Sequence, residues 1–276
     1  MTVLEVLNGA TDYLGRQGVE SPRLNAEYLL AHVLGKKKRI ELYLDFERPL
    51  GEKERAPLRE LVRERANGRP LQHLLGTVEF CGREFVCDGR ALIPRPETEQ
   101  LVEMVLGRIE ENAAVLDVGT GSGVIAITIA LQKPTAAVTA VDVSTDALAL
   151  ARENATRLGA RVGFLESDLL AAVPGPWNAM VANLPYVAAA DMEELSREVR
   201  HDPRLALDGG EDGLDLVRRL VVDAKNSLAP GGLVALEIGH DQAARVRALF
   251  EANNYRDIAV SADYQGVERF VFAVHG

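Results

Sequence analysis

Cysteine is scarce in this sequence, which has only two in 276 residues. Cys81 and Cys87 flank Gly82-Arg83, which we expect to form a tight hairpin turn, and in that register they do not face each other as a disulfide requires. Two free thiols indicate a reducing compartment. The sequence also lacks a basic start followed by an apolar stretch, and no apolar run reaches the roughly 20 residues of a membrane span. We therefore expect a cytoplasmic protein that does not enter a membrane.

An excess of basic residues is missing as well, because 31 Lys and Arg stand against 41 Asp and Glu, a net charge of -10. Such a surface repels phosphate backbones, so we expect no direct nucleic-acid partner, and a basic protein partner suits it better. The one basic run, residues 36–39, is more typical of a solvated approach to a helix than of an RNA contact. Neither the histidines nor the cysteines have the spacing of metal ligands, so we expect no metal site.

Three patterns follow one another along the chain. Residues 1–75 have only helical periodicity and predict a compact helical domain, in which Ser21-Pro22 favours a helix start with Ser21 as its cap. Residues 76–92 alternate apolar and polar positions around the expected turn and predict a β-hairpin linker. Residues 93–276 alternate strands with helices, which predicts an α/β fold with a mostly parallel sheet covered by helices on both faces. The expected strands are residues 114–117, 138–142, 162–166, 179–182, 233–238, 258–262 and 269–274.

A glycine-rich loop follows the first of these strands. Its residues are Gly119, Thr120, Gly121, Ser122 and Gly123. Glycines at these positions let the backbone turn sharply beside a helix N-terminus, so that a ligand can lie close to it. The dinucleotide fingerprint would need a further glycine at position 124, where valine stands. The loop therefore favours a ligand without a pyrophosphate, such as S-adenosylmethionine.

Acidic residues at three successive strand ends support this interpretation. Asp142 ends the next strand and can accept hydrogen bonds from both ribose hydroxyls, while Asp117 lies near the expected methionine end of the cofactor. Asp168 can accept from the adenine amino group, and Leu169 can cover the adenine face. Glycines after a strand are often plain turn residues, but the three carboxylates together favour a cofactor site.

The fourth strand runs into Asn183-Leu184-Pro185-Tyr186, which suits the chemistry of amide methylation. An amide nitrogen is a poor nucleophile because its lone pair is delocalised into the carbonyl. Two acceptors, the Asn183 side-chain oxygen and the Leu184 carbonyl, can grip both N–H bonds and aim the nitrogen at a methyl group. Tyr186 can stack on the flat amide and Pro185 can fix the turn. Taken alone, the segment is better interpreted as an Asx-turn after a strand, with Pro185 and Tyr186 packing locally. Its position at a strand end of the same sheet, beside the glycine loop, favours the site instead.

With these motifs the chain resembles the protein-(glutamine-N5) methyltransferases of peptide-chain release factors. Besides the glycine loop and the tetrapeptide, the resemblance rests on residues 92–99 (Leu-Ile-Pro-Arg-Pro-Glu-Thr-Glu), 202–207, 209–214 and 237–239. It implies a Rossmann-like S-adenosylmethionine-dependent methyltransferase domain, and a small helical domain at residues 1–75 that docks the substrate. The implied substrate is the glutamine of the Gly-Gly-Gln motif in class I release factors. Residues 119–123, Asp142 and residues 168–169 would hold the cofactor, and Asn183 to Tyr186 the glutamine. We expect Asn183 to contact the cofactor as well.

One departure from the family pattern concerns Leu184, because the family usually has proline there. The acceptor at that position is a backbone carbonyl, which leucine still supplies. Arg95 and Glu97 could close over the cofactor or cap the helix that starts at Pro96, and the resemblance favours the site role. Three alternatives stay open: a glutamine methyltransferase acting on a ribosomal protein, an adenine or cytosine amino methyltransferase acting on nucleic acid, and a non-catalytic binder of an adenosine ligand.

Overall fold

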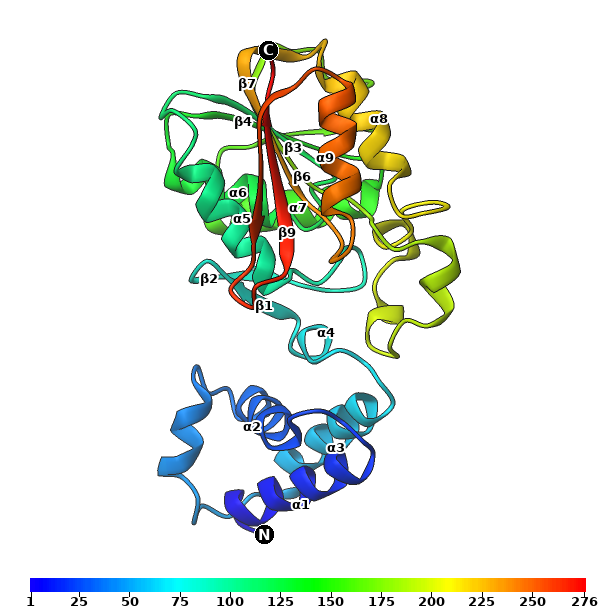
Figure 1. Ribbon diagram of the computed structural model, residues 1–276. Helices are drawn as coiled ribbons and strands as arrows, with labels where there is room; N and C mark the ends of the chain where they lie inside the picture. Colours follow the sequence, from blue (N-terminus) through cyan, green and yellow to red (C-terminus); the bar gives the residue numbers. More distant parts are fainter. The chain divides into compact units, whose positions relative to one another are not determined.

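The computed structural model describes residues 1–276, which form two compact units (Figure 1). The helical unit comprises residues 1–77 together with 196–201, and the sheet unit comprises residues 78–195 and 202–276. The short segment 196–201 belongs to the helical unit although it lies far along the chain. No periodicity in the sequence predicts this association. None of the helices is both long and apolar enough to cross a lipid bilayer.

The helical unit is built from four α-helices and two 3₁₀ helices: α1 (Val3–Arg16), α2 (Pro22–Val33), η1 (Arg39–Leu44), α3 (Glu52–Ala66), α4 (Leu71–Leu75) and, from the late segment, η3 (Val199–His201). Thr2 and Glu5 form a reciprocal cap at the start of α1, because each side chain accepts from the backbone N–H of the other. Leu7, Leu29 and Leu30 are fully buried between these helices. Burial of this apolar stripe is the main stabilising contribution to so small a bundle.

Ser21 precedes α2 as expected, but its side chain does not cap the helix, and it has a left-handed φ of 47°. Asn25 in the first turn of α2 instead holds the preceding loop, since its Nδ2 donates to the carbonyls of Glu20 and Ser21. The Oδ1 of Asn25 accepts from the buried guanidinium of Arg65 at 2.6 Å, and Arg65 also pairs with Glu198 from the segment 196–201. This buried polar group links that late segment to α2 and α3 of the helical unit.

The hairpin consists of β1 (Thr77–Phe80) and β2 (Arg83–Val86). Its turn is Cys81-Gly82, one residue earlier than the expected Gly82-Arg83, so that prediction is wrong by one position. Both turn residues have left-handed φ values, 47° and 71°. Two consecutive left-handed residues match the twist of hairpin strands, and the glycine adopts this conformation without strain. Both cysteines are free.

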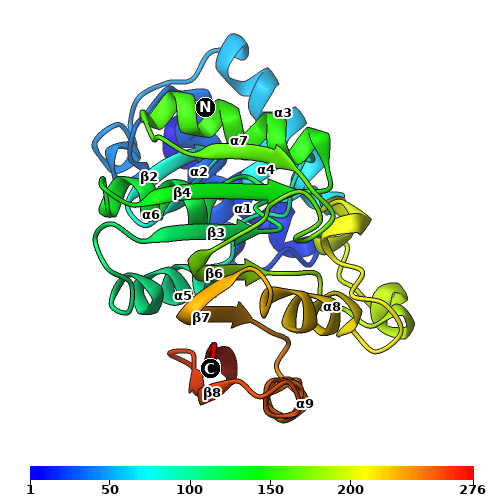
Figure 2. The same cartoon turned by 90° about the horizontal axis from the view of Figure 1, so that it is seen from above.

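The main sheet has seven strands in the order β5-β4-β3-β6-β7-β9-β8, and Figure 2 shows β4, β3, β6 and β7 side by side. The strands are β3 (Ala114–Val118), β4 (Ala137–Asp142), β5 (Gly163–Glu166), β6 (Trp177–Asn183), β7 (Leu228–Glu237), β8 (Arg256–Ala262) and β9 (Glu268–Val274). The first five are parallel, whereas β9 runs antiparallel to β7 and β8. All seven expected strands are present. The strand expected at residues 233–238 starts earlier, at Leu228. The helix before it, α8, ends at Ala224.

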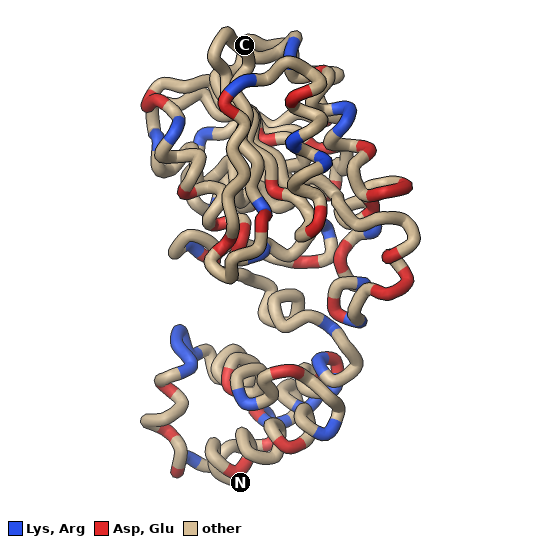
Figure 3. Tube along the Cα trace, viewed as in Figure 1, with Lys and Arg blue, Asp and Glu red and all other residues tan.

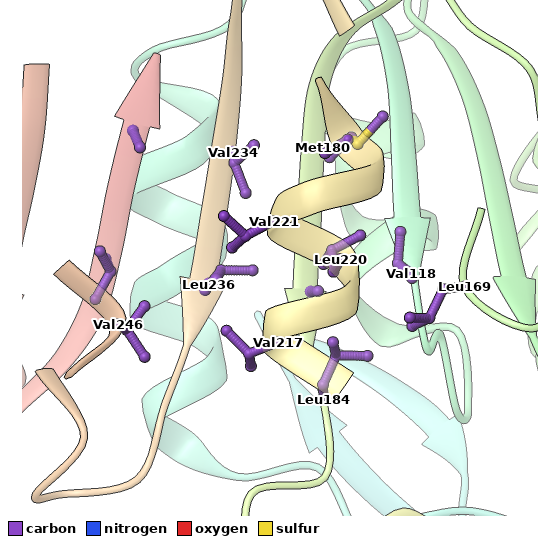
Figure 4. Packing of buried hydrophobic residues seen from close by; sticks show 14 of the residues in the cluster. Val118, Leu169, Met180, Leu184, Val217, Leu220, Val221, Val234, Leu236 and Val246 are labelled. Carbon is purple, nitrogen blue, oxygen red and sulfur yellow. The ribbon is translucent and has the colours of Figure 1, made fainter. Parts of the chain in front are cut away.

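Helices cover both faces of this sheet. They are α5 (Pro96–Leu106), α6 (Val124–Gln132), α7 (Thr145–Leu158), α8 (Asp215–Ala224) and α9 (Ala243–Ala252). Apolar residues of α5 and α6 form the core on one face, and those of α8 and α9 form it on the other. Figure 4 shows Val217, Leu220 and Val221 of α8 lying over the strands, in the same apolar cluster as Leu184. The expected α/β class with helices on both faces is confirmed.

Candidate functional site

The glycine loop and the tetrapeptide lie at the same edge of the sheet. β3 and β6 are parallel neighbours with Val118 opposite Ala182, so the residues that follow them leave the sheet side by side. The carboxyl ends of parallel strands are where open α/β sheets bind ligands. A cavity of about 310 Å³ opens there. Of the residues singled out in the sequence, it is lined by Gly119, Thr120, Gly121, Ser122, Asp142, Asp168, Leu169, Asn183, Leu184 and Pro185.

Asp117, Gly123 and Tyr186 are not among the lining residues. Gly123 has a φ of 84°, and a Cβ there would come within 3.0 Å of the Ala151 Cβ and closer still to Ile127. It therefore allows α6 and α7 to approach each other behind the loop. The Asp117 carboxylate is fully buried and accepts from the Thr120 hydroxyl at 2.6 Å.

Burial raises the pKa of Asp117 to about 7, against the opposing hydrogen bonds from Thr120 and the Ala126 N–H. One of its oxygens, Oδ1, is buried without a partner. A buried unpaired acceptor costs roughly 1–3 kcal/mol, which is typical of a site awaiting a donor. Asp117 lies behind the cavity wall and is bonded to Thr120, which lines the cavity. Its negative charge at this position fits the positive methionine end of S-adenosylmethionine.

Asp142 anchors the loop while staying available to a ligand. Its Oδ2 accepts from the Gly121 N–H at 2.9 Å and its Oδ1 from the Ser144 N–H at 2.8 Å. Each carboxylate oxygen has a second lone pair, so both can still accept from a ribose hydroxyl. Burial is the main cause that raises the pKa of Asp142.

Residues that follow β5 form another part of the cavity wall. Leu169 is buried and has a left-handed φ of 49°, while its neighbour Asp168 is exposed and pairs with Arg219 at 2.8 Å. Sequence reasoning missed several lining residues, for which no motif gave a signal. They include Arg90, Val143 and Leu216, whereas Leu92 and Leu205 belong to the quoted runs 92–99 and 202–207.

Asn183 ends β6 at the wall of the cavity with one amide atom paired and one unpaired. Its Nδ2 donates to the Thr98 hydroxyl at 3.2 Å, and its Oδ1 is buried without a partner. Leu184 buries its side chain, and a Cβ on Gly119 would come within 3.0 Å of its Cδ2. The loop after β3 and the loop after β6 are therefore packed directly against each other.

The far end of the tetrapeptide is held by its backbone. Gln242 donates from Nε2 to the Tyr186 carbonyl at 3.0 Å. A Cβ on Gly209 would lie 2.7 Å from the Pro185 carbonyl oxygen, and one on Gly213 would lie 2.3 Å from the Tyr186 oxygen. Only glycine fits at these two positions, which explains the glycines of the 209–214 run. Burial is the main cause that raises the pKa of the Tyr186 hydroxyl.

The two residues that the sequence left undecided are now placed. Arg95 lines the cavity and bonds the buried Asp202 carboxylate at 3.0 Å, and its side chain does not cap α5. Asp202 also accepts from the Ile93 N–H at 3.2 Å, so it holds the 92–99 run in place. Glu97 does not line the cavity. Thr98 and Glu237 were quoted only as parts of motifs, yet they contact the site through the hydrogen bond to Asn183.

This sheet, the glycine loop and the acidic residues at the strand ends define the class of S-adenosylmethionine-dependent methyltransferases. Comparison with known proteins agrees: the family described as PrmC N-terminal domain matches residues 5–76, and the Methyltransferase small domain matches residues 97–202. A release factor glutamine methyltransferase of Geobacter sulfurreducens is 44% identical over 272 residues, covering 98% of this chain and 95% of its own length. The chain belongs to the release factor glutamine methyltransferase family.

Two further matches fit this assignment. The enzyme of the same name from Deinococcus radiodurans is 44% identical over 275 residues, covering 99% of this chain and 98% of its own. A methyltransferase of Pyrococcus furiosus with 18% identity has a similar fold, with a TM-score of 0.56 over 71% of this chain and 90% of that one. The expected family, enzyme class and cofactor are therefore confirmed.

Proposed function

We propose that this chain transfers a methyl group from S-adenosylmethionine to the side-chain nitrogen N5 of the glutamine in the Gly-Gly-Gln motif of class I release factors. The names of the relatives support the substrate. The observation that carries the chemistry is the unpartnered Oδ1 of Asn183, in the same cavity wall as the glycine loop. An amide N–H is the donor that this oxygen lacks.

In this proposal the cofactor supplies an electrophilic methyl group on sulfur, and the protein does the positioning. The loop 119–123 with Asp117 would hold the methionine end, Asp142 the ribose, and residues 168–169 the adenine. Apolar residues dominate the remaining wall, which would exclude water from the reacting atoms.

The tetrapeptide would hold the substrate. Asn183 Oδ1 and the Leu184 carbonyl would accept the two N–H bonds of the glutamine amide and turn its nitrogen toward the methyl group. Pro185 shapes the turn, and the Tyr186 ring would lie against the amide plane, with its backbone fixed by Gln242. The leucine at 184 keeps the acceptor and adds an apolar anchor that packs on Gly119.

The helical unit would dock the release factor, and we propose residues 1–75 as the docking domain, 76–92 as the hairpin linker and 93–276 as the methyltransferase domain. The free thiols suit work in the cytoplasm. Charged residues of both signs are interspersed along both units (Figure 3). Within the basic run, Lys36 pairs with Asp45 and Arg39 with Glu27, which leaves little positive charge for a nucleic acid.

The substrate is tested by transfer of a radiolabelled methyl group to purified release factor, to its Gly-Gly-Gln→Gly-Gly-Ala variant, to ribosomal protein and to DNA. Label is expected on intact release factor alone. Label on DNA or on ribosomal protein instead, or equal label on both factor variants, would replace the proposal with the corresponding alternative.

The role of Asn183 is tested separately with Asn183→Ala. The rate of methyl transfer is expected to fall by about 100-fold or more, because the substrate amide nitrogen is no longer oriented toward the methyl group. The dissociation constant for the cofactor, measured by calorimetry, should change far less. A variant with undiminished transfer would contradict the role of Asn183, and a protein that binds cofactor but never labels any substrate would be the non-catalytic binder.

A further inference from the structure

A short chain of hydrogen bonds leads from Asn183 into the protein interior. Asn183 Nδ2 donates to Thr98 Oγ1 at 3.2 Å, and the Thr98 hydroxyl donates to Glu237 Oε2 at 2.7 Å. Thr98 lies in the first turn of α5, and Glu237 is the last residue of β7, where it is opposite Asn183 in the sheet. Thr98 is 2% exposed and Glu237 is 3% exposed. Three elements therefore meet around one polar path that solvent does not reach.

The direction of hydrogen-bond donation along this path determines which atom of the Asn183 amide, Oδ1 or Nδ2, remains without a partner. A hydroxyl carries a single proton, whereas an ionised carboxylate can only accept. When Glu237 is ionised, the Thr98 proton goes to Glu237, so Thr98 Oγ1 can only accept from the amide. Asn183 must then present Nδ2 to Thr98, and its Oδ1 is the atom without a partner.

A protonated Glu237 permits the reverse order. Its O–H can donate to Thr98 Oγ1, and the Thr98 hydroxyl is then free to donate to Asn183. The amide would turn so that Oδ1 accepts from Thr98 and the NH₂ group is left over. That arrangement offers a donor where the glutamine amide of the substrate needs an acceptor.

We propose that Thr98 and ionised Glu237 are positioning residues which fix the orientation of the Asn183 amide, so that its Oδ1 is the acceptor for the substrate amide. This inference rests on the proposed role of Asn183 and deepens it. Neither positioning residue touches the substrate, and both act through the orientation of one side chain. The path gives the buried Glu237 carboxylate at the end of β7 a hydrogen-bonding role.

The surroundings of Glu237 give this arrangement a dependence on pH. Burial raises the pKa of Glu237 to about 7, and the charge of Glu97 on α5 raises it further. The Thr98 hydrogen bond, the charge of Arg269 on β9 and a weaker side-chain interaction with the Asn183 amide itself lower it. Glu237 therefore favours the same Nδ2-inward orientation of Asn183 directly as well as through Thr98. Arg269 is itself paired with Asp263 at 2.9 Å. A group with this pKa is about nine-tenths ionised at pH 8 and about one-tenth ionised at pH 6. The fraction of molecules in which Asn183 presents Oδ1 to the substrate therefore decreases as the pH falls from 8 to 6.

The first experiment removes the hydroxyl while keeping the shape. Thr98→Val in the full-length protein is expected to lower kcat for release factor by about tenfold or more, while the dissociation constant for S-adenosylmethionine stays within about twofold. Thr98→Ser keeps the hydroxyl and is expected to restore most of the rate. The matched control is Thr128→Val, because Thr128 is a fully buried threonine whose hydroxyl has no partner. It should leave kcat unchanged, and circular dichroism of all three variants verifies folding.

The second experiment measures kcat against pH. With S-adenosylmethionine saturating at every pH, so that titration of Asp117 does not limit cofactor binding, the wild-type kcat should fall by about tenfold from pH 8 to pH 6. Residue 237 cannot titrate in Glu237→Gln, so the fall should be markedly smaller in this variant. A Thr98→Val variant as active as wild type, or an acid limb that persists unchanged in Glu237→Gln, would overturn the inference while Asn183→Ala remains inactive. A normal rate for Asn183→Ala would instead contradict the role of Asn183 itself. Failure of the wild type to label release factor would contradict the proposed function.

Discussion

The contact between Gly119 and Leu184 gives a direct test of whether the two site loops touch. Gly119→Ala is expected to destabilise the sheet unit for two reasons. An alanine at a φ of 73° costs about 1–2 kcal/mol, and its Cβ would lie 3.0 Å from the Leu184 Cδ2, which must move. Leu184→Ala should cost about 2–5 kcal/mol, since it removes a leucine side chain that is 4% exposed from the core.

The double variant separates the contact from the two single effects. Without the leucine side chain the alanine Cβ meets nothing, so only the cost of the backbone conformation remains. We therefore expect the double variant to be more stable than the sum of the single effects predicts, by about 0.5–1.5 kcal/mol. The protein contains one tryptophan, Trp177 in β6. Its fluorescence during urea unfolding reports on the sheet unit. Costs that add to within about 0.3 kcal/mol would show that the loops do not touch.

Three further predictions concern burial and charge. Because the pKa values of Asp117 and Glu237 are about 7 in the folded protein, above their usual values of 3.8 and 4.5, the native state binds more protons than the unfolded state between about pH 4.5 and 7. The free energy of unfolding should thus fall as pH rises through this range, by about 1.4 kcal/mol per pH unit for each group, and Glu237→Gln should halve the slope in urea titrations. Burial raises the pKa of Cys81 to about 11 and of Cys87 to about 12, so iodoacetamide at pH 8 should label the native protein slowly and the unfolded protein rapidly; equal rates would refute this. Arg65→Ala should lower the stability of the helical unit by about 2–4 kcal/mol in far-ultraviolet circular dichroism, with little change in the tryptophan transition.

Local sequence patterns predicted most of the fold. Strands and helices of the sheet unit follow from strongly periodic apolar runs. The glycine loop can be predicted because its three alternate left-handed positions, Gly119, Gly121 and Gly123, favour glycine. The errors are local ones. The hairpin turn was misplaced by one residue, because Gly82 fits either position of a two-residue turn and the alternation of strands permits both registers.

The remaining part of the site depends on contacts between distant residues. Nothing near Thr98 or Glu237 in the sequence indicates that they meet beside Asn183, since that meeting requires the register of β6 and β7 and the placement of α5. The same applies to Gln242, which holds the Tyr186 carbonyl across 56 positions of sequence. Hydrogen bonds between elements carry no periodic signature, so they emerge only with the three-dimensional structure.

Residues 196–201 have a bearing on how this protein could be divided. Arg65 is bonded to Glu198, 133 positions further along the chain, within the same compact unit. A fragment that stops at residue 77 would keep α1 to α4 but strip a buried guanidinium of its anionic partner. A fragment that ends at residue 77 should therefore have a lower free energy of unfolding than the complete helical unit. Adding a peptide that contains Glu198 should restore part of this stability.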